Sequence, residues 1–131
     1  MHKSVGAIIK NEKGKILMIE RKKFPPGWAC PAGHIDRGES PENAMMREIK
    51  EEVGLNVKEF KLLIHKFVDW NKCSKGEIGH DWHVYEVVDY DGEIKRSKDE
   101  TKNLRWVSAN RLRKLDLEKV WRMWFDKLNI L

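Results

Sequence analysis

The sequence predicts an α/β fold in which a mixed β-sheet lies between helical layers. Strand-like segments rich in β-branched and aromatic residues stand on both sides of one helical pattern in residues 41–53, and further helical patterns follow toward the C-terminal end. Hydrophobic residues make up 40% and charged residues 36% of the 131 positions, which is a globular composition. This length suits one domain over residues 1–131, with a core that needs no disulfide or structural metal.

The first half of the chain contains three extended segments. Residues 4–10 (SVGAIIK) alternate and predict a strand, and residues 15–21 (KILMIER) are apolar on both faces, which predicts a strand covered on both sides. Because a short turn joins these two segments, we expect them to pair as a hairpin. After a Pro-Pro-Gly loop, residues 29–36 (ACPAGHID) should be short and extended, and Pro31 argues against a central ladder position.

A helix is predicted for residues 41–53. Ser40 is a typical N-cap residue before Pro41, and Gly54 is a typical stop. At about 100° per residue, one apolar arc and one acidic arc adjoin on this helix, so we expect the acidic arc at the edge of the buried face. The apolar arc holds Met45, Met46, Ile49 and Val53, and the acidic arc holds Glu48, Glu51 and Glu52.

The second half predicts more strands and two helices. Residues 60–70 and 80–90 should be strands joined by a polar loop at 71–79, and residues 104–107 a short strand. Ser108 should cap a short helix over the following residues. The C-terminal segment carries an apolar stripe at helical spacing, which indicates core packing rather than a cofactor site. The stripe contains Val120, Trp121, Trp124, Phe125 and Leu128.

The chain is basic, with a net charge of +5 and a pI near 9.2. This balance favours anionic partners such as nucleotides, permits nucleic acid without indicating it, and equally suits a surface that only confers solubility. Cys30 and Cys73 form no CxxC pair, so the cysteines indicate neither a zinc site nor a disulfide, and we expect a reducing, cytoplasmic location. No apolar run approaches the roughly 18 residues that span a membrane, and no signal peptide is indicated.

Three glutamates in one helical turn raise the question of what offsets their repulsion. They form either an ordinary solvated face or a cation site. Glu48 and Glu52 are four residues apart and can reach one site, and Glu51 lies on the same side. Clustered carboxylates suit a hard divalent cation such as Mg²⁺, which keeps several waters and is shared with substrate phosphates.

The loop before the helix supplies further parts of such a site. Gly33 and Gly38 should adopt backbone conformations closed to other residues, and a carbonyl near Ala32 should face the ion. Arg47 has two alternative partners. It can pair with Glu51 one turn away, or reach back to Glu39 and hold the loop against the helix.

Residues 33–55 (GHIDRGESPENAMMREIKEEVGL) resemble the signature of the Nudix hydrolase family, G-x5-E-x7-R-E-U-x-E-E-x-G-U, where U is aliphatic. Every fixed position matches without a gap, at Gly33, Glu39, Arg47, Glu48, Ile49, Glu51, Glu52, Gly54 and Leu55. The segments GWACPAG and DETKNLRWVSANRL, on either side of this box, are compatible with the family. The resemblance implies an α/β/α sandwich with a central mixed β-sheet. It also implies hydrolysis of a pyrophosphate bond in a nucleoside diphosphate linked to another group, with magnesium, or sometimes manganese, as cofactor.

The resemblance also assigns roles within the box. Glu48 and Glu52 become the principal metal ligands, the Ala32 carbonyl becomes another, and Glu51 becomes a further ligand, direct or through water. Glu100 matches a downstream acid of the family, so Glu51 and Glu100 are rivals for the general base. The supporting positions, which hold the loop and orient the glutamates, are Gly33, Glu39, Arg47 and Gly54.

Substrate contacts are expected from basic and aromatic residues. Arg21, Lys22 and Lys23 stand before the Pro-Pro loop and are candidates for phosphate contact or, alternatively, a solvated strand end. Trp28, Trp70 and Trp82 either stack on a base or pack in the core. His80 and His83 should point to opposite faces of their strand because their spacing is odd, so we do not expect them to share an ion.

Three functions remain open at this stage. The leading one is hydrolysis of a nucleoside triphosphate or related nucleotide. The second is a pyrophosphohydrolase acting on RNA ends or dinucleoside polyphosphates, and the third is a non-catalytic nucleotide-binding module. Because all box glutamates are present, the third is disfavoured. Monomer and homodimer are both compatible with the sequence.

Overall fold

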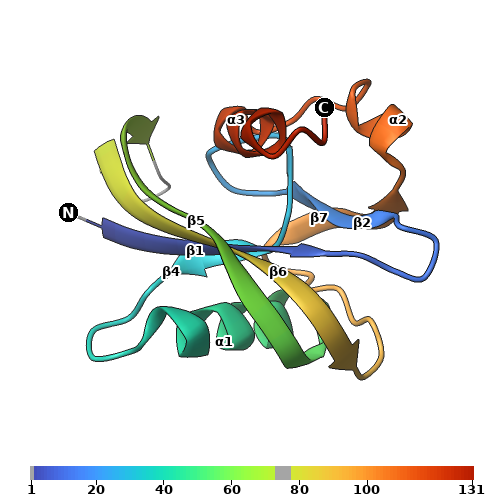
Figure 1. Cartoon of the computed structure of the whole chain (residues 1–131), viewed down its shortest axis with the longest axis horizontal. Coiled ribbons are helices and arrows are strands. Elements are labelled where there is room, and N and C mark those ends of the chain that lie inside the picture. Colours follow the sequence, from blue (N-terminus) through green and yellow to red (C-terminus); the bar gives the residue numbers. More distant parts are fainter. Residues whose placement is uncertain (1, 73–77) are drawn as a thin grey trace.

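The structure is a computed structural model that describes residues 2–72 and 78–131. In chain order (Figure 1), the elements are β1 (His2–Ile9), β2 (Ile16–Arg21), β3 (Trp28–Ala29), β4 (Ala32–His34), α1 (Pro41–Val53), β5 (Asn56–Lys72), β6 (Ile78–Asp91), β7 (Thr101–Val107), α2 (Ala109–Leu112) and α3 (Lys119–Lys127).

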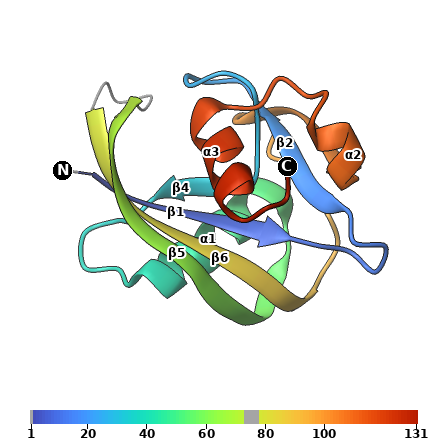
Figure 2. The same ribbon diagram turned by 45° about the horizontal axis from the view of Figure 1, so that its top comes forward.

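The strands form two sheets. A four-stranded sheet has the order β4-β1-β6-β5 and is mixed, because β1 and β6 run parallel while the other pairs are antiparallel. A three-stranded antiparallel sheet has the order β3-β2-β7. Helix α1 covers one face of the four-stranded sheet and α3 lies over the opposite face (Figures 1 and 2). The expected α/β/α layering around a mixed sheet is therefore confirmed.

The predicted hairpin between the first two strands is wrong. The turn itself closes, because the Asn11 N–H donates to the Lys15 carbonyl at 2.9 Å and Lys10 bridges to Ile16. Beyond it the strands separate, and β1 pairs with β4 and β6 while β2 pairs with β3 and β7. Both strands are apolar on both faces, and each takes an internal position in its own sheet, where neighbours cover it on both edges.

Other boundaries differ from the sequence-based expectation. Strands β5 and β6 extend beyond residues 60–70 and 80–90, and β7 begins three residues before the expected strand at Leu104. The segment at 29–36 is not one strand, because Ala29 ends β3 and residues 32–34 form β4. Within the expected loop at 71–79, residues 73–77, which include Cys73, lie outside the described residues. The sequence underestimates these strands because polar residues at their ends still join the backbone ladders.

Helix α1 has the predicted ends. The Ser40 hydroxyl accepts a hydrogen bond from the Asn43 N–H at 3.1 Å, Pro41 occupies the first turn, and Gly54 adopts a left-handed conformation with φ of 80°. Ser108 likewise caps α2 through the Arg111 N–H. These local signals are reliable because they depend on the backbone groups that every helix end leaves unpaired.

The C-terminal stripe packs in the core, as predicted. Trp121 and Trp124 of α3 are fully buried and meet the Trp82 ring edge-on, with centroid separations of 6.2 and 6.0 Å. Gly6 of β1 makes room for this contact, because a Cβ there would lie 2.7 Å from Trp121 Cη2. Among the described helices, none has the length and apolar character needed to span a membrane. The cytoplasmic location and the single-domain organisation stay predictions.

Candidate active site

The three box glutamates of α1 have different environments. Glu52 is buried, the Glu48 side chain is 13% exposed, and the Glu51 side chain is 55% exposed. Glu100, in the turn before β7, lies beside Glu48 and Glu52. One carboxylate oxygen from each of these three residues lies within 4.8 Å of the others. Backbone pairing holds this turn in place, because the Lys22 N–H donates to the Glu100 carbonyl at 3.0 Å. The structure thus brings together three of the four predicted catalytic carboxylates.

The electrostatics of this cluster favour a bound cation. Burial is the main cause that raises the pKa of Glu52 well above its usual range, and the charges of Glu48 and Glu100 add to it. Burial likewise raises the pKa of Glu48 to about 7, against the opposing effect of Arg47. Ionising several neighbouring carboxyl groups in a desolvated site is unfavourable. A bound divalent ion would stabilise their charged forms.

Glu52 and Glu48 are seated against β4. The Ala32 N–H donates to Glu52 Oε2 at 2.9 Å. The Glu48 carboxyl group lies directly against Gly33, where an added Cβ would collide with it. The expectation that Gly33 needs a special backbone conformation is wrong, because its φ is not positive and the reason for glycine is space. Gly38 does have the expected left-handed conformation, with φ of 83°.

Arg47 contacts both of its predicted partners, Glu39 and Glu51. Its guanidinium donates to both oxygens of Glu39, at 2.8 and 3.0 Å, and to Glu51 Oε2 at 3.3 Å. It also donates to Glu48 Oε1 at 2.9 Å and to the His34 carbonyl at 3.0 Å. The Arg47 hydrogen bonds are the main cause that lowers the pKa of Glu39 to about 2. Arg47 therefore fixes the loop, β4 and Glu48 relative to one another, in a supporting role.

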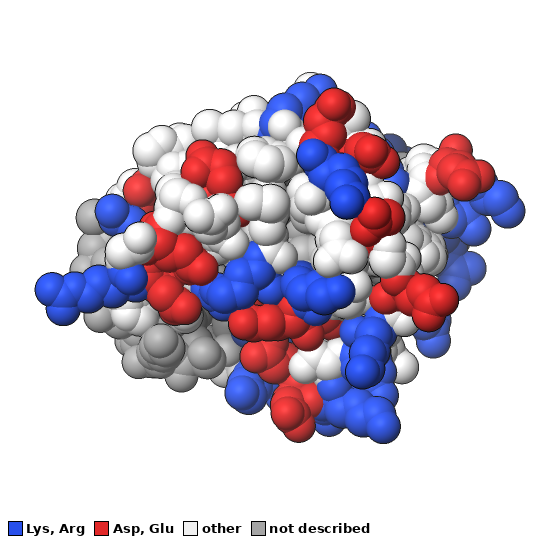
Figure 3. Space-filling view, turned by 90° about the horizontal axis from the view of Figure 1, so that it is seen from below, with Lys and Arg blue, Asp and Glu red and all other residues white. Residues whose placement is uncertain are grey.

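A hollow of about 260 Å³, here called the carboxylate hollow, opens over this cluster. Predicted phosphate contacts Arg21 and Lys23 line it together with the three carboxylates. Lys22 does not line it, and its ammonium group donates instead to the Lys98 carbonyl. The face that carries α1 shows basic and acidic side chains closely intermixed (Figure 3). The full lining is Ile19, Arg21, Lys23, Ala32, Gly33, His34, Asp36, Glu48, Glu52 and Glu100.

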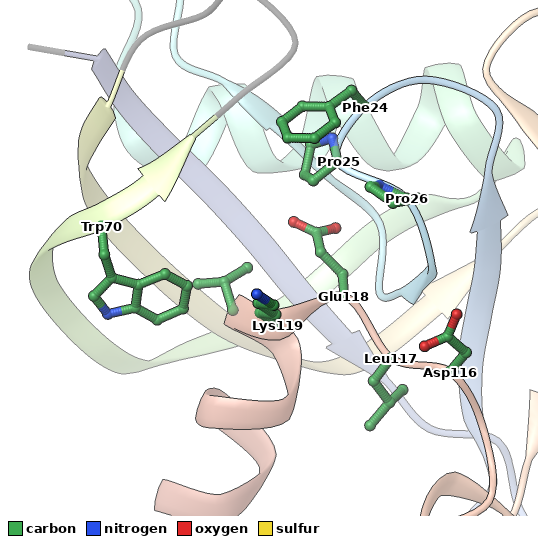
Figure 4. Close-up of a pocket in the computed structure, with 9 residues that line it drawn as sticks. Phe24, Pro25, Pro26, Trp70, Asp116, Leu117, Glu118 and Lys119 are labelled. Carbon is green, nitrogen blue, oxygen red and sulfur yellow. The ribbon is translucent and has the colours of Figure 1, made fainter.

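A second hollow of about 480 Å³, here called the aromatic hollow, lies between the Pro-Pro loop and the start of α3. In Figure 4 the Glu118 carboxylate extends toward Phe24 and Pro25, and the Trp70 indole stands at the other side. The lining residues are Phe24, Pro25, Pro26, Trp70, Asp116, Leu117, Glu118, Lys119 and Val120. A mainly apolar lining with a few polar groups, here Asp116, Glu118 and Lys119, is typical of a small-molecule pocket.

Glu118 is the site residue that the sequence did not indicate. It is only 6% exposed, and among the described residues no donor lies within hydrogen-bond distance of its Oε2 atom. Burial raises the pKa of Glu118 to about 7, against the opposing charge of Arg21. A lone glutamate before an apolar helix carries no motif, so its burial and orientation become visible only in the folded chain.

Arg21 joins the two hollows. Its Nε donates to the Pro25 carbonyl at 3.0 Å and lies 3.8 Å from Glu118 Oε2, while its side chain also lines the carboxylate hollow. Arg21 therefore lines the carboxylate hollow and contacts two residues that line the aromatic hollow.

The three candidate tryptophans have three different places. Trp70 lines the aromatic hollow, and Trp82 is buried in the core. Trp28 lines neither hollow; Arg105 lies over its ring at 5.8 Å. The Trp28 backbone instead pairs with Asp116 and Glu118, at 2.8 and 2.9 Å, and so holds one wall of the aromatic hollow. A direct substrate contact by Trp28 stays a prediction, as do metal contacts by Glu51 and the Ala32 carbonyl.

The sequence of this chain is similar to those of known proteins. A family model described as "NUDIX domain" matches residues 1–127. An RNA pyrophosphohydrolase of Actinobacillus succinogenes is 34% identical over 121 residues, covering 80% of this chain and 60% of the relative. A putative 8-oxo-dGTP diphosphatase of Bacillus subtilis is 36% identical over 109 residues, covering 80% and 65%. This chain thus spans less than two thirds of the length of these two curated relatives.

Solved structures agree with the fold. A MutT NUDIX hydrolase from Burkholderia pseudomallei is 30% identical with a TM-score of 0.77, and 93% of each chain is covered. The NUDIX domain of Shewanella oneidensis NrtR, solved with ADP ribose, has a TM-score of 0.78 over 96% of this chain and 84% of that one. At 15% identity, this second likeness shows the fold alone.

Proposed function

Given that this chain belongs to the Nudix hydrolase family, we propose that it hydrolyses a pyrophosphate bond in a nucleoside diphosphate linked to another group, with Mg²⁺ as the cofactor. The observation that carries the proposal is that three clustered carboxylates and two cationic side chains line the carboxylate hollow together. The carboxylates suit a divalent ion, and the cations suit the phosphates that such an ion accompanies.

The residues present fit a magnesium site. Glu48, Glu52 and Glu100 offer hard oxygen ligands, and their mutual repulsion in a desolvated place needs a cation. Manganese takes similar oxygen ligands and is the alternative. When bound, the ion supplies charge neutralisation on phosphate oxygens and a more acidic water.

The protein's own residues perform the other tasks. Arg21 and Lys23 bind and orient the phosphates in the carboxylate hollow. Of the two rival bases, the geometry favours Glu100, because Glu51 is engaged by Arg47 and stands apart from the cluster. A carboxylate at this place accepts the proton of the attacking water. The Arg47–Glu39 pair keeps Glu48 in position throughout.

The aromatic hollow supports a nucleotide as the substrate. Trp70 and Phe24 provide ring faces on which a base stacks, and Glu118 provides a polar group for the base edge or the sugar. With a pKa near 7, the Glu118 carboxyl group can donate or accept at neutral pH. Arg21, between the hollows, directs the phosphates toward the carboxylates. We therefore propose a nucleoside triphosphate or a related nucleotide as the leading substrate class.

A second candidate substrate is the 5′ end of an RNA or a dinucleoside polyphosphate. The similarity to an RNA pyrophosphohydrolase and the net charge of +5 favour this alternative. Both candidates place one nucleoside in the aromatic hollow and differ in what extends beyond it.

The test measures phosphate and pyrophosphate release with Mg²⁺ from nucleoside triphosphates, dinucleoside polyphosphates and 5′-triphosphorylated RNA. We expect turnover that is lost in Glu52→Gln and kept in Glu59→Gln, a matched change at an exposed strand position. Preference for RNA over free nucleotides would support the second candidate. If the intact protein turns over no substrate, or if Glu52→Gln keeps full activity, the proposal is wrong.

A further inference from the structure

We propose that His2, His34 and His80 form a binding site for a borderline divalent transition ion such as Zn²⁺, separate from the carboxylate cluster. One ring nitrogen from each histidine lies within 4.8 Å of the other two. The inference stands independently of the proposed hydrolase function, because it concerns another group of ligands and another class of metal.

The sheet register brings the three histidines together. They come from three adjacent strands, β4, β1 and β6, and His2 stands directly opposite His80. His34 stands opposite Ser4, which is two residues from His2 and therefore on the same face. This is the face of the four-stranded sheet where Gly6 meets Trp121 of α3. Rigid backbone pairing thus holds all three side chains, which is how precise metal sites are built.

The three rings lie close together, with His2 edge-on to the other two and His34 stacked on His80 at an angle of 13°. His2 lies 4.7 Å from His34 and 5.6 Å from His80 between ring centroids, at steep interplanar angles of 69° and 72°. His34 and His80 are 5.6 Å apart. Tetrahedral zinc with Zn–N bonds of about 2.0–2.1 Å needs nitrogens about 3.4 Å apart, so a closure of roughly 1 Å is enough. Small side-chain rotations supply such a movement.

A neighbouring hydroxyl orients one of the ligands. Ser4 Oγ lies 2.9 Å from His80 Nδ1, and both residues are buried. A metal bound by His80 would then be held through Nε2, with the other ring nitrogen fixed by a hydrogen bond, the usual arrangement of metal-binding histidines. His2 and His34 are partly exposed and also line a surface hollow, which gives an ion a route and leaves a fourth position for water.

The ligand type separates this site from the magnesium site. Imidazole nitrogens suit zinc, copper, iron and nickel, whereas Mg²⁺ prefers carboxylates and water. The adjoining hollow is lined by two acidic residues, Asp36 and Glu39, and by two basic residues, Lys3 and Arg37. These charged side chains cancel in number, so the imidazole ligands decide which ion binds.

The proposed ion would link the amino-terminal strand to the box. It would cross-link β1, β4 and β6 through side chains. His34 follows Gly33, which touches Glu48, and the His34 carbonyl accepts a hydrogen bond from Arg47. An ion on His34 would therefore restrain the backbone against which the carboxylate ligands are seated, so we expect it to raise thermal stability.

A second histidine cluster provides the control. His65, Asp81 and His83 also offer ligand atoms within 4.8 Å of one another, so they are the alternative site for such an ion. His65 Nε2 meets Asp81 Oδ1 at 3.1 Å, and the two imidazole rings stack face to face at 3.9 Å with an angle of 20°.

The experiment titrates the metal-free full chain, without a polyhistidine tag, with Zn²⁺ against a chromophoric chelator. We expect one tight site, with binding at least about 100-fold weaker in His34→Ala and in His2→Ala. His2→Ala guards against loss of folding, because its ring is less buried than that of His80. Co²⁺ should give the visible absorption of a tetrahedral complex in the wild type and not in these variants, and Zn²⁺ should raise the melting temperature.

Two controls assign the ion to this place. His65→Ala tests the other histidine cluster and Glu52→Gln tests the carboxylate cluster, and both should keep the tight site. The proposal is overturned if the wild type binds no Zn²⁺, if either His34→Ala or His2→Ala binds as the wild type does, or if His65→Ala or Glu52→Gln abolishes binding. None of these readouts depends on hydrolysis.

Discussion

The carboxylate hollow and the aromatic hollow each contain one buried glutamate, and the two glutamates have different neighbours. Glu52 lies beside Glu48 and Glu100 and accepts a backbone N–H, whereas Glu118 shares its hollow with Phe24 and two prolines and lies 3.8 Å from Arg21 Nε. Burial raises the pKa of both. The comparison teaches that the same residue type at similar burial suits a cation when it is clustered, and a polar ligand edge when it is alone.

The largest effect should come from the carboxylate hollow. Glu52→Gln keeps the side-chain shape but removes a charged ligand, so the transition state loses electrostatic stabilisation worth several kcal/mol. We expect kcat to fall by about 10³-fold, measured as phosphate release with saturating Mg²⁺. Glu118→Gln should change kcat much less. An equal loss of kcat in both variants would remove the distinction between the hollows.

The aromatic hollow should govern a pH-dependent part of stability. The pKa of Glu118 is about 7 in the folded protein and its ordinary value is near 4.5. The Glu118 side chain of the unfolded chain then binds fewer protons between these values, so its contribution to stability is full below about pH 4.5 and is lost as pH rises through 7, a change of about 3 kcal/mol. Because the pKa values of Glu48 and Glu52 are also raised, the Glu118 part is measured as the difference between wild type and Glu118→Gln, by urea denaturation of the metal-free proteins at pH 5 and pH 8. Glu118→Gln should lose about 3 kcal/mol less than the wild type over this range, and an equal fall in both would contradict the assignment.

Gly33→Ala tests how closely the carboxylate hollow is packed. The added Cβ collides with the Glu48 carboxyl group, and displacement of such a group costs about 1–3 kcal/mol. We expect kcat/KM to fall by about 10- to 100-fold, in a steady-state assay with the preferred nucleotide. Gly14→Ala is the control, because its Cβ meets no atom within 4 Å. That control should lose only about 1 kcal/mol of stability from its positive φ and keep its activity.

Trp70→Ala gives the smallest expected effect. Loss of one stacking face weakens base binding by about 1–3 kcal/mol, so KM should rise by about 10-fold with kcat nearly unchanged. Trp28→Ala is the matched comparison, because the Trp28 ring lies under Arg105 and outside both hollows. A rise in KM in Trp28→Ala alone would restore Trp28 as the stacking residue and remove Trp70 from the site.

Local signals predicted the box and its helix correctly. Ser40, Pro41 and Gly54 define α1 through backbone groups that are adjacent in sequence, and the resemblance fixed the positions of Glu48 and Glu52. The hairpin prediction failed, since turn geometry decides only the first bridge at Lys10 and strand pairing is decided by the whole sheet. Glu100 shows the same limit, because its position far from the box in sequence does not show that its carboxylate meets Glu48 and Glu52.

The sequence by itself determined the family, the helix that carries the carboxylates, and the charged and apolar character of each segment. Tertiary structure decided which distant residues meet: Glu100 with the box, Glu118 with the Pro-Pro loop, and the three histidines across β4, β1 and β6. The physical reason is the distance along the chain over which each interaction acts. Capping and helical periodicity act within a few residues, whereas burial, strand register and the pKa shifts that follow from them exist only after separate segments have packed together.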